Sequence, residues 1–225
     1  MIRREAAERD KMRDLETAAL RAQMNPHFIF NCLQAIQSFI ARNERDVATS
    51  YLARFAKLIR LTLHGSVDGR HSLAEEMAML ENYLLLEQMR FKGHFEFVIR
   101  TSEGLDPEEI SLPPLLVQPY VENALIHGLE GRETGGRVEI IFTQKQDALE
   151  VTVTDNGKGF SEKENVALDK RPHNSVGMML TQKRLDLLAG AGKNAGEHFS
   201  RETLLDASGA VTGTRIRFEV PVLNG

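Results

Sequence analysis

The sequence has very little cysteine and no tryptophan. Its 225 residues include one cysteine, Cys32. A single cysteine excludes an internal disulfide framework and a cysteine-rich zinc site, and it fits a reducing compartment. No run of about 18 apolar residues is present, and the N-terminal residues lack the apolar core of a signal peptide. We therefore expect a soluble, cytoplasmic chain in which Cys32 is a small core residue.

An excess of basic charge is also missing. The chain has 28 Lys and Arg against 32 Asp and Glu, a formal net charge of -4. Nucleic-acid binding usually needs a basic footprint, so we expect no nucleic-acid partner. Hydrophobic residues make up 42% and charged residues 27%, which excludes wholesale disorder. The length fits one large domain or two modest ones.

The first third of the chain has the periodicity of amphipathic helices. Its apolar residues recur at three- and four-residue steps, as in a heptad seam. This predicts a helix over about residues 5–42, bent where Pro26 removes a backbone donor. Asn43 and Asp46 are expected to cap a second helix that ends at Gly65. The seam comprises Met12, Leu15, Ala19, Ala22, Ile29, Leu33, Ile36 and Ile40, and the second stripe Val47, Tyr51, Phe55, Leu58, Ile59 and Thr62.

A hairpin of two such helices buries little by itself. We therefore expect it to dimerise into a four-helix bundle, which makes the protein a homodimer. A third helix is predicted from the capping box Ser72-Leu-Ala-Glu75 to about Phe91. We place a helical region at residues 1–68 and a second domain at residues 69–225.

The period changes to that of strands after Gly93, where apolar and polar residues alternate over Phe95 to Ile99. Pro113 and Pro114 are expected to open a helix through about Gly128. The strands outnumber the helices and include hairpin-like pairs, so the prediction is an α+β fold with a mixed sheet covered by helices on one face. The other expected elements are strands at 138–142, 149–154 and 216–220, a helix at 177–188 and a mobile loop at 160–175.

A glycine-containing segment, Asp155-Asn-Gly-Lys-Gly-Phe160, directly follows a predicted strand. Gly157 and Gly159 would let the backbone approach a ligand closely. Taken alone, such a segment is more often a surface turn. It is not a protein-kinase glycine loop, because Glu162 replaces the third glycine. The stretch Gly190-Ala-Gly-Lys193 lacks the residues of a P-loop on both sides and is interpreted as a loop.

Two helical segments carry polar residues with chemical potential. The segment 115–128 places Glu122, Asn123 and His127 close together, and such groups could hold a hydrated Mg²⁺ and contact phosphates. In the first helix, His27 lies one residue past a heptad seat, with Asn31 one turn further along the same face. A lone helical histidine or amide is more often structural. The flanking Asn25-Pro-His-Phe-Ile-Phe-Asn31 sets His27 apart.

Together and in this order, the segments resemble those of the LytS-type sensor histidine kinases of bacterial two-component systems. The segment Leu20–Asn31 is similar to the phosphoacceptor segment of that family, which points to His27 as the phosphorylated residue. Leu80–Phe91 resembles its linking helix. Leu112–Gly128 resembles the N box, whose Mg²⁺-binding asparagine matches Asn123.

The rest of the resemblance lies in the glycine motifs, and the whole match covers about residues 20–221. Asp155–Phe160 resembles the first glycine box, whose aspartate accepts a hydrogen bond from the adenine amino group. Ser175–Met178 resembles the second glycine box, and Gly213–Thr214 the closing Gly-Thr motif. The resemblance thus implies nucleotide-binding roles for Asn123, His127, Asp155, Gly157, Gly159, Gly177 and Thr214.

Three positions depart from the pattern of the family. In the second glycine box, Ser175 replaces the first glycine and Leu180 the asparagine. Pro119 stands where many related ATPases carry a glutamate that activates water. This last difference disfavours a hydrolase.

The resemblance implies a helical dimerisation and phosphotransfer region followed by a Bergerat-type ATP-binding domain. ATP, with Mg²⁺, would donate its γ-phosphoryl group to a nitrogen of His27, and an aspartate of a response regulator would later receive it. Asn31 is expected to orient the imidazole, and Glu122 is a candidate catalytic acid beside Asn123. Membrane attachment would come only from segments upstream of this chain.

Two alternatives remain open. One is a Bergerat-fold ATPase or an anti-sigma-type serine/threonine kinase, neither of which needs the helix around His27. The other is a non-catalytic dimeric scaffold with an altered second glycine box. Acid-labile, alkali-stable label from γ-labelled ATP would separate the three.

Overall fold

The computed structural model describes residues 26–65, 71–91, 93–146, 148–159, 178, 181, 185 and 199–221. Among these residues, no helix is long and apolar enough to cross a membrane. Several predicted features lie outside them. These are residues 5–25 of the first helix, the side chain of His27, the loop 160–175, Gly177 with most of the helix 177–188, and the loop 190–193.

The helical hairpin begins with α2 (Pro26–Ala41), which is followed by α3 (Arg45–Gly65). Asn43 lies between them with φ at 62°. It therefore ends α2 in the left-handed conformation and does not cap α3, which corrects the prediction for this residue. Asp46 lies in the first turn of α3, where the helix dipole favours a carboxylate.

The buried face of α2 is not the predicted heptad seam. Cys32 is fully buried, as predicted, and accepts a hydrogen bond of 3.4 Å from the Tyr51 hydroxyl of α3. Phe39 is buried on the same face. The seam residues Leu33 and Ile40 are instead 45% and 61% exposed, so this apolar stripe is left uncovered in the single chain.

The third predicted helix is confirmed as α4 (Leu73–Arg90). The Ser72 hydroxyl accepts the backbone N–H of Glu75 at 3.2 Å, and the Glu75 carboxylate accepts the backbone N–H of Ser72 at 2.9 Å. Both bonds of the capping box are therefore present, and they satisfy donors that the first turn leaves unpaired. The helix ends at Phe91, as expected.

The sheet is mixed, as predicted. Its order is β2-β4-β5-β7-β6, with a parallel pair at β2 and β4 and antiparallel pairs elsewhere. Alternate residues of β4 and β5 are buried, because successive side chains of a strand point to opposite faces. The polar edge strand β6 was missed by the sequence analysis. The strands are β2 (Phe95–Thr101), β4 (Gly136–Gln144), β5 (Ala148–Asp155), β6 (Phe199–Leu205) and β7 (Val211–Pro221).

The helix predicted to open at Pro113 and Pro114 begins later. Residues 113–117 form a turn instead, and α5 spans Gln118–Asn123. It continues as a π-helical segment, η1 (Ala124–Gly128), closed by the N–H of Leu129 on the carbonyl of Ala124 at 3.0 Å. Such π segments are rare and often occur at functional sites.

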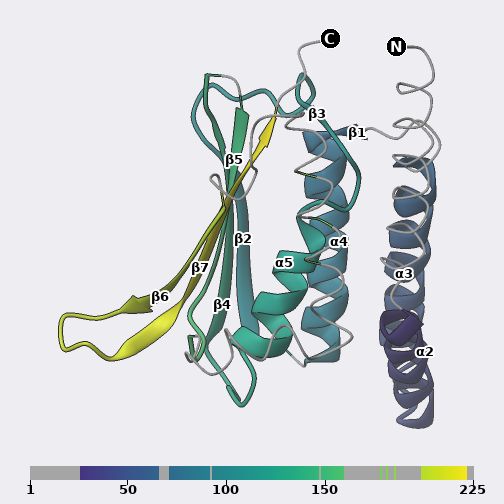
Figure 1. Ribbon diagram of the computed structural model, residues 1–225. Coiled ribbons are helices and arrows are strands. Elements are labelled where there is room, and N and C mark those ends of the chain that lie inside the picture. Colours follow the sequence, from purple (N-terminus) through teal and green to yellow (C-terminus); the bar gives the residue numbers. More distant parts are fainter. Residues whose placement is uncertain are drawn as a thin grey trace, which may run out of the picture.

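The elements pack as layers (Figure 1). Helices α4 and α5 cover one face of the sheet, and the α2–α3 hairpin lies beside α4 on the side away from the sheet. Contacts between aromatic rings join the layers. The ring centroids of Tyr120 of α5 and Phe218 of β7 are 4.4 Å apart, and those of Phe28 of α2 and Tyr83 of α4 are 5.4 Å apart. The predicted α+β fold, with helices on one face of a mixed sheet, is confirmed.

Candidate functional site

Asp155 is a buried carboxylate at the end of β5. Its Oδ1 accepts the backbone N–H of Gly157 at 2.9 Å, and Thr214, its partner on β7, donates from both its backbone and its side chain. Burial raises the pKa of Asp155, although these hydrogen bonds and nearby Arg201 act to lower it. The carboxylate is therefore fixed in orientation by the loop that follows β5 and by β7.

Glycines allow three backbone segments to meet at Asp155. A methyl group on Gly128 would lie 2.7 Å from the Asp155 Cγ, and one on Gly157 would lie 1.9 Å from the carbonyl oxygen of Gly128. On Gly213, it would lie 1.9 Å from the Asp155 carbonyl oxygen. These contacts are too short for any side chain, so the end of η1 and the start of β7 close around the carboxylate.

At Gly159, the same loop packs closely against the β6–β7 hairpin. Its φ is 71°, and an added methyl group would lie 2.5 Å from Val211 Cγ1 and 2.8 Å from Thr203 Cγ2. A side chain at this position would be both strained and crowded. The structure therefore brings together Asp155, Gly157, Gly159 and Thr214, as the resemblance implied.

Asn123 and Glu122 lie at the end of α5. Asn123 is buried, and Glu122 is half-buried and accepts a 2.9 Å hydrogen bond from the Gln118 side chain. Burial raises the pKa of Glu122 to about 7, Gln118 lowers it, and the charge of Glu87 raises it. A carboxyl group with this pKa can exchange a proton near neutral pH. His127 follows in η1, half-buried, in the segment whose last residue packs on Asp155.

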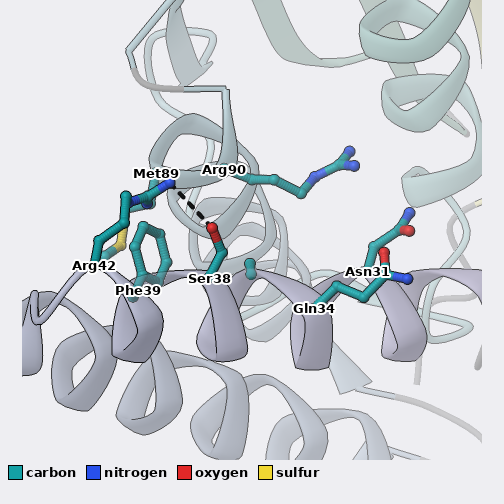
Figure 2. A pocket seen from close by; sticks show the side chains of 8 residues that line it. Asn31, Gln34, Ser38, Phe39, Arg42, Met89 and Arg90 are labelled. Atoms are coloured by element: carbon teal, nitrogen blue, oxygen red, sulfur yellow. Dashed lines mark hydrogen bonds between the residues drawn. The ribbon is translucent and has the colours of Figure 1, made fainter.

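His27 is the second residue of α2, and Asn31 follows it by one helical turn. Asn31 lines a cavity of about 280 Å³ that lies between α2 and the C-terminal end of α4. Within the described part of the chain, the lining includes two arginines and no acidic residue, and Figure 2 shows the Arg90 side chain extending above α2. The cavity is lined by Asn31, Gln34, Ala35, Ser38, Phe39, Arg42, Met89 and Arg90.

Both arginines of this cavity are held in place. Arg90 donates to the buried Glu87 carboxylate through Nε at 3.0 Å and through Nη2. Arg42 donates to the Ser38 hydroxyl at 3.0 Å, drawn in Figure 2, and to Glu44. Arg90 was not predicted for this site, because the packing of α4 against α2 is a tertiary contact.

Comparisons with known proteins identify the family of the chain. Two family models match the chain: "Histidine kinase" over residues 15–95 and "Histidine kinase-like ATPase domain" over residues 92–197. Together they take in most of the chain. The chain therefore belongs to the histidine kinase family, and its second part matches the ATPase-like domain of that family.

Within that family, the resemblance to LytS-type sensor kinases is confirmed. "Sensor histidine kinase YpdA" of Escherichia coli is 30% identical over 82% of this chain and 32% of that protein. "Sensor protein LytS" of Bacillus subtilis is 30% identical over 94% of this chain and 34% of that protein. "Sensor protein LytS" of Enterococcus faecalis is 32% identical over 71% of this chain and 26% of that protein. The chain therefore spans about a third of the length of these relatives.

Proposed function

We propose that this chain is the catalytic region of a sensor histidine kinase that phosphorylates His27 from ATP and passes the phosphoryl group to an aspartate of a response regulator. In the first step the bond from the γ-phosphorus to the bridging oxygen breaks, a nitrogen–phosphorus bond forms on the imidazole, and ADP leaves. The observation that carries this proposal is the closing of three motif segments around one buried carboxylate, Asp155.

Asp155 is proposed to bind the adenine base. Its carboxylate is oriented by Gly157 and Thr214. An ionised carboxylate only accepts hydrogen bonds, so it suits the exocyclic amino group of adenine and not the carbonyl of guanine. The glycines around it let the end of η1 and the start of β7 pack directly on Asp155, which fixes the carboxylate in place. This arrangement favours ATP over GTP.

Asn123 is proposed to hold Mg²⁺ near the phosphates. Its side chain offers an amide oxygen, and Glu122 is the adjacent carboxyl group. Mg²⁺ takes few protein ligands and completes its shell with water and substrate phosphates, so this small donor set fits it. When bound, the ion would neutralise phosphate charge. Glu122, with its pKa near 7, is proposed to take up the proton released when the imidazole becomes phosphorylated.

The phosphoacceptor part of the proposal concerns α2. Neutral imidazole is nucleophilic near pH 7, so positioning is the main requirement. Asn31, one turn from His27, is proposed to orient the ring. The cavity lined by Asn31 also contains Gln34 and Ser38, whose polar side chains suit hydrogen bonding to a receiver domain.

The assembly is proposed to be a homodimer built on residues 1–68, with the ATP-binding domain at 69–225. The uncovered stripe of α2 includes Phe30, Leu33 and Ile40, which are 65%, 45% and 61% exposed. Such a stripe is typical of a helix that pairs with a second copy. The catalytic region is proposed to act in the cytoplasm, with any membrane attachment supplied by parts of a longer protein.

Incubation with γ-labelled ATP and Mg²⁺ tests the proposed function. We expect acid-labile, alkali-stable label on the wild type and none on His27→Gln, which should still bind nucleotide. His94→Gln, a change at an exposed histidine, is the matched control and should label as the wild type does. Acid-stable label would favour a serine/threonine kinase, and continued release of phosphate an ATPase. Nucleotide binding without either would favour a scaffold.

A further inference from the structure

A buried carboxylate outside the nucleotide site joins two distant parts of the chain. Glu76, on the first turn of α4, has a fully buried side chain. Its Oε2 accepts the backbone N–H of Leu115 at 3.0 Å, and its Oε1 accepts that of Val117 at 3.0 Å. A buried carboxylate is costly without such partners, so the turn and the carboxylate stabilise each other.

His71 completes this cluster. Its Nε2 lies 2.9 Å from Oε2 of Glu76, and its side chain is 3% exposed. It belongs to the short strand β1 (His71–Ser72), which pairs with β3 (Ser111–Leu112) beside the N-terminal end of α4 (Figure 1). Strand β1 is the first described segment after α3. The cluster thus connects β1 and the first turn of α4 with the turn before α5.

The turn that Glu76 holds is an unusual one. Leu115 has φ at 59°, in the left-handed region that residues other than glycine rarely adopt. Strained backbone of this kind persists only where the surrounding structure fixes it, and it clusters at functional sites. The two hydrogen bonds from Leu115 and Val117 to one carboxylate supply that restraint.

The restraint passes directly into α5. The carbonyl of Val117 accepts the N–H of Tyr120 at 3.1 Å and of Val121 at 3.3 Å. Val117 is therefore bound by Glu76 through its N–H and by the first turn of α5 through its carbonyl. Asn123 lies at the other end of this six-residue helix. Rigid secondary elements are among the carriers of coupling between distant sites, and α5 connects the restrained turn with Asn123.

We propose that Glu76 is a positioning residue which, with His71, holds the turn 113–117 and thereby sets the place of Asn123 for the Mg²⁺-bound phosphates of ATP. This role rests on the proposed function, since it assumes that Asn123 serves Mg²⁺. It predicts that the cluster matters for the Mg²⁺-dependent part of ATP affinity. The adenine site depends on it less directly, because the Asp155 carboxylate is also oriented by Gly157 and by Thr214 of β7.

Calorimetry with ATP, in Mg²⁺ and in EDTA, tests this role on the full chain. A glutamine at position 76 has one acceptor oxygen for two N–H donors. We expect Glu76→Gln to weaken Mg²⁺-ATP binding about tenfold, or about 1.4 kcal/mol, and to weaken binding in EDTA much less. Glu81→Gln, an exposed change on the same helix, is the matched control and should leave both affinities unchanged. His71→Gln, which leaves the Glu76 carboxylate and its two backbone donors intact, should stay close to the wild type.

Two results would overturn the role. One is a Glu76→Gln protein with the full gain in affinity from Mg²⁺, and the other is an equal loss with and without Mg²⁺, which indicates general damage. If circular dichroism shows that this variant does not fold, Glu76→Asp replaces it under the same criteria, because the shorter carboxylate cannot span both donors. A wild type that binds no ATP would instead reject the proposed function, and this role with it.

Discussion

The ring of Phe28 packs against the ring of Tyr83 with their centroids 5.4 Å apart. Phe28 directly follows His27 in the sequence, and Tyr83 lies on the helix that covers the sheet. The start of α2 is therefore seated on the ATP-binding domain and not only on its partner helix α3. This contact places the proposed phosphoacceptor segment against α4. Helix α5, which ends at Asn123, lies in the same helical layer as α4.

Asp155→Asn should weaken ATP binding. The amide would present N–H donors to the adenine amino group, and an unmatched buried donor costs about 1 to 3 kcal/mol, or roughly 5- to 150-fold in affinity. Calorimetry with ATP and GTP would measure this, with Asp106→Asn as an exposed control. Unchanged ATP affinity in Asp155→Asn, or a wild type that binds GTP equally well, would remove Asp155 from the adenine site.

The double change Phe30→Asp and Leu33→Asp should dissociate the dimer. Both side chains are largely exposed on α2, so the charges disturb the interface between copies more than the packing within one chain. By contrast, Ile36 packs against the core, and its replacement would damage the hairpin itself. Leu205→Asp, at an exposed leucine on β6, is the control and should leave the dimer intact. Light scattering at tens of micromolar measures the oligomeric state of each protein. This concentration is a usual regime for homodimers of micromolar affinity. A monomeric wild type there would contradict the prediction.

Stability should depend on pH through Glu122. Burial raises its pKa from the ordinary 4.5 to about 7, so between these values the folded protein keeps a proton that the unfolded chain has released. The contribution of Glu122 to the free energy of unfolding is fully present below pH 4.5 and is lost as the pH rises through 7. Glu122→Gln mimics the protonated form. Between about pH 5 and pH 8, its free energy of unfolding should therefore fall by about 1 to 3 kcal/mol less than that of the wild type.

Urea unfolding at the two pH values measures this difference. Glu81→Gln, an exposed change, is the control and should follow the wild type. Parallel pH dependence of the wild type and Glu122→Gln would show that Glu122 titrates normally.

ATP consumption should be limited by the acceptor. Pro119 lies at the start of α5, where related ATPases place a glutamate, so the γ-phosphoryl group should react with the imidazole in preference to water. In a short reaction without a regulator, we expect about one ADP per phosphorylated His27, a stoichiometry that follows from one acceptor per chain. A coupled assay that finds sustained turnover in His27→Gln would favour the ATPase alternative. Pro119→Glu need not create an ATPase, because the proline also shapes the helix.

Features governed by local interactions were predicted from the sequence. The capping box of Ser72 and Glu75 needs residues three apart, and both of its hydrogen bonds form. The alternation in β4 and β5 reflects burial of one face, which a period of two encodes directly. The first glycine box was located because Asp155, Gly157 and Gly159 follow a strand within five residues.

Only the tertiary structure decided features that depend on distant partners. The turn at 113–117 replaces the predicted start of a helix because Glu76, 39 residues before Leu115, binds its amides. The polar strand β6 exists through its pairing with β7. The enclosure of Asp155 by Gly128 and Gly213 joins segments that no local pattern relates. Local sequence sets backbone preference and periodicity, whereas contacts across the fold select which preference is kept and which side chains meet.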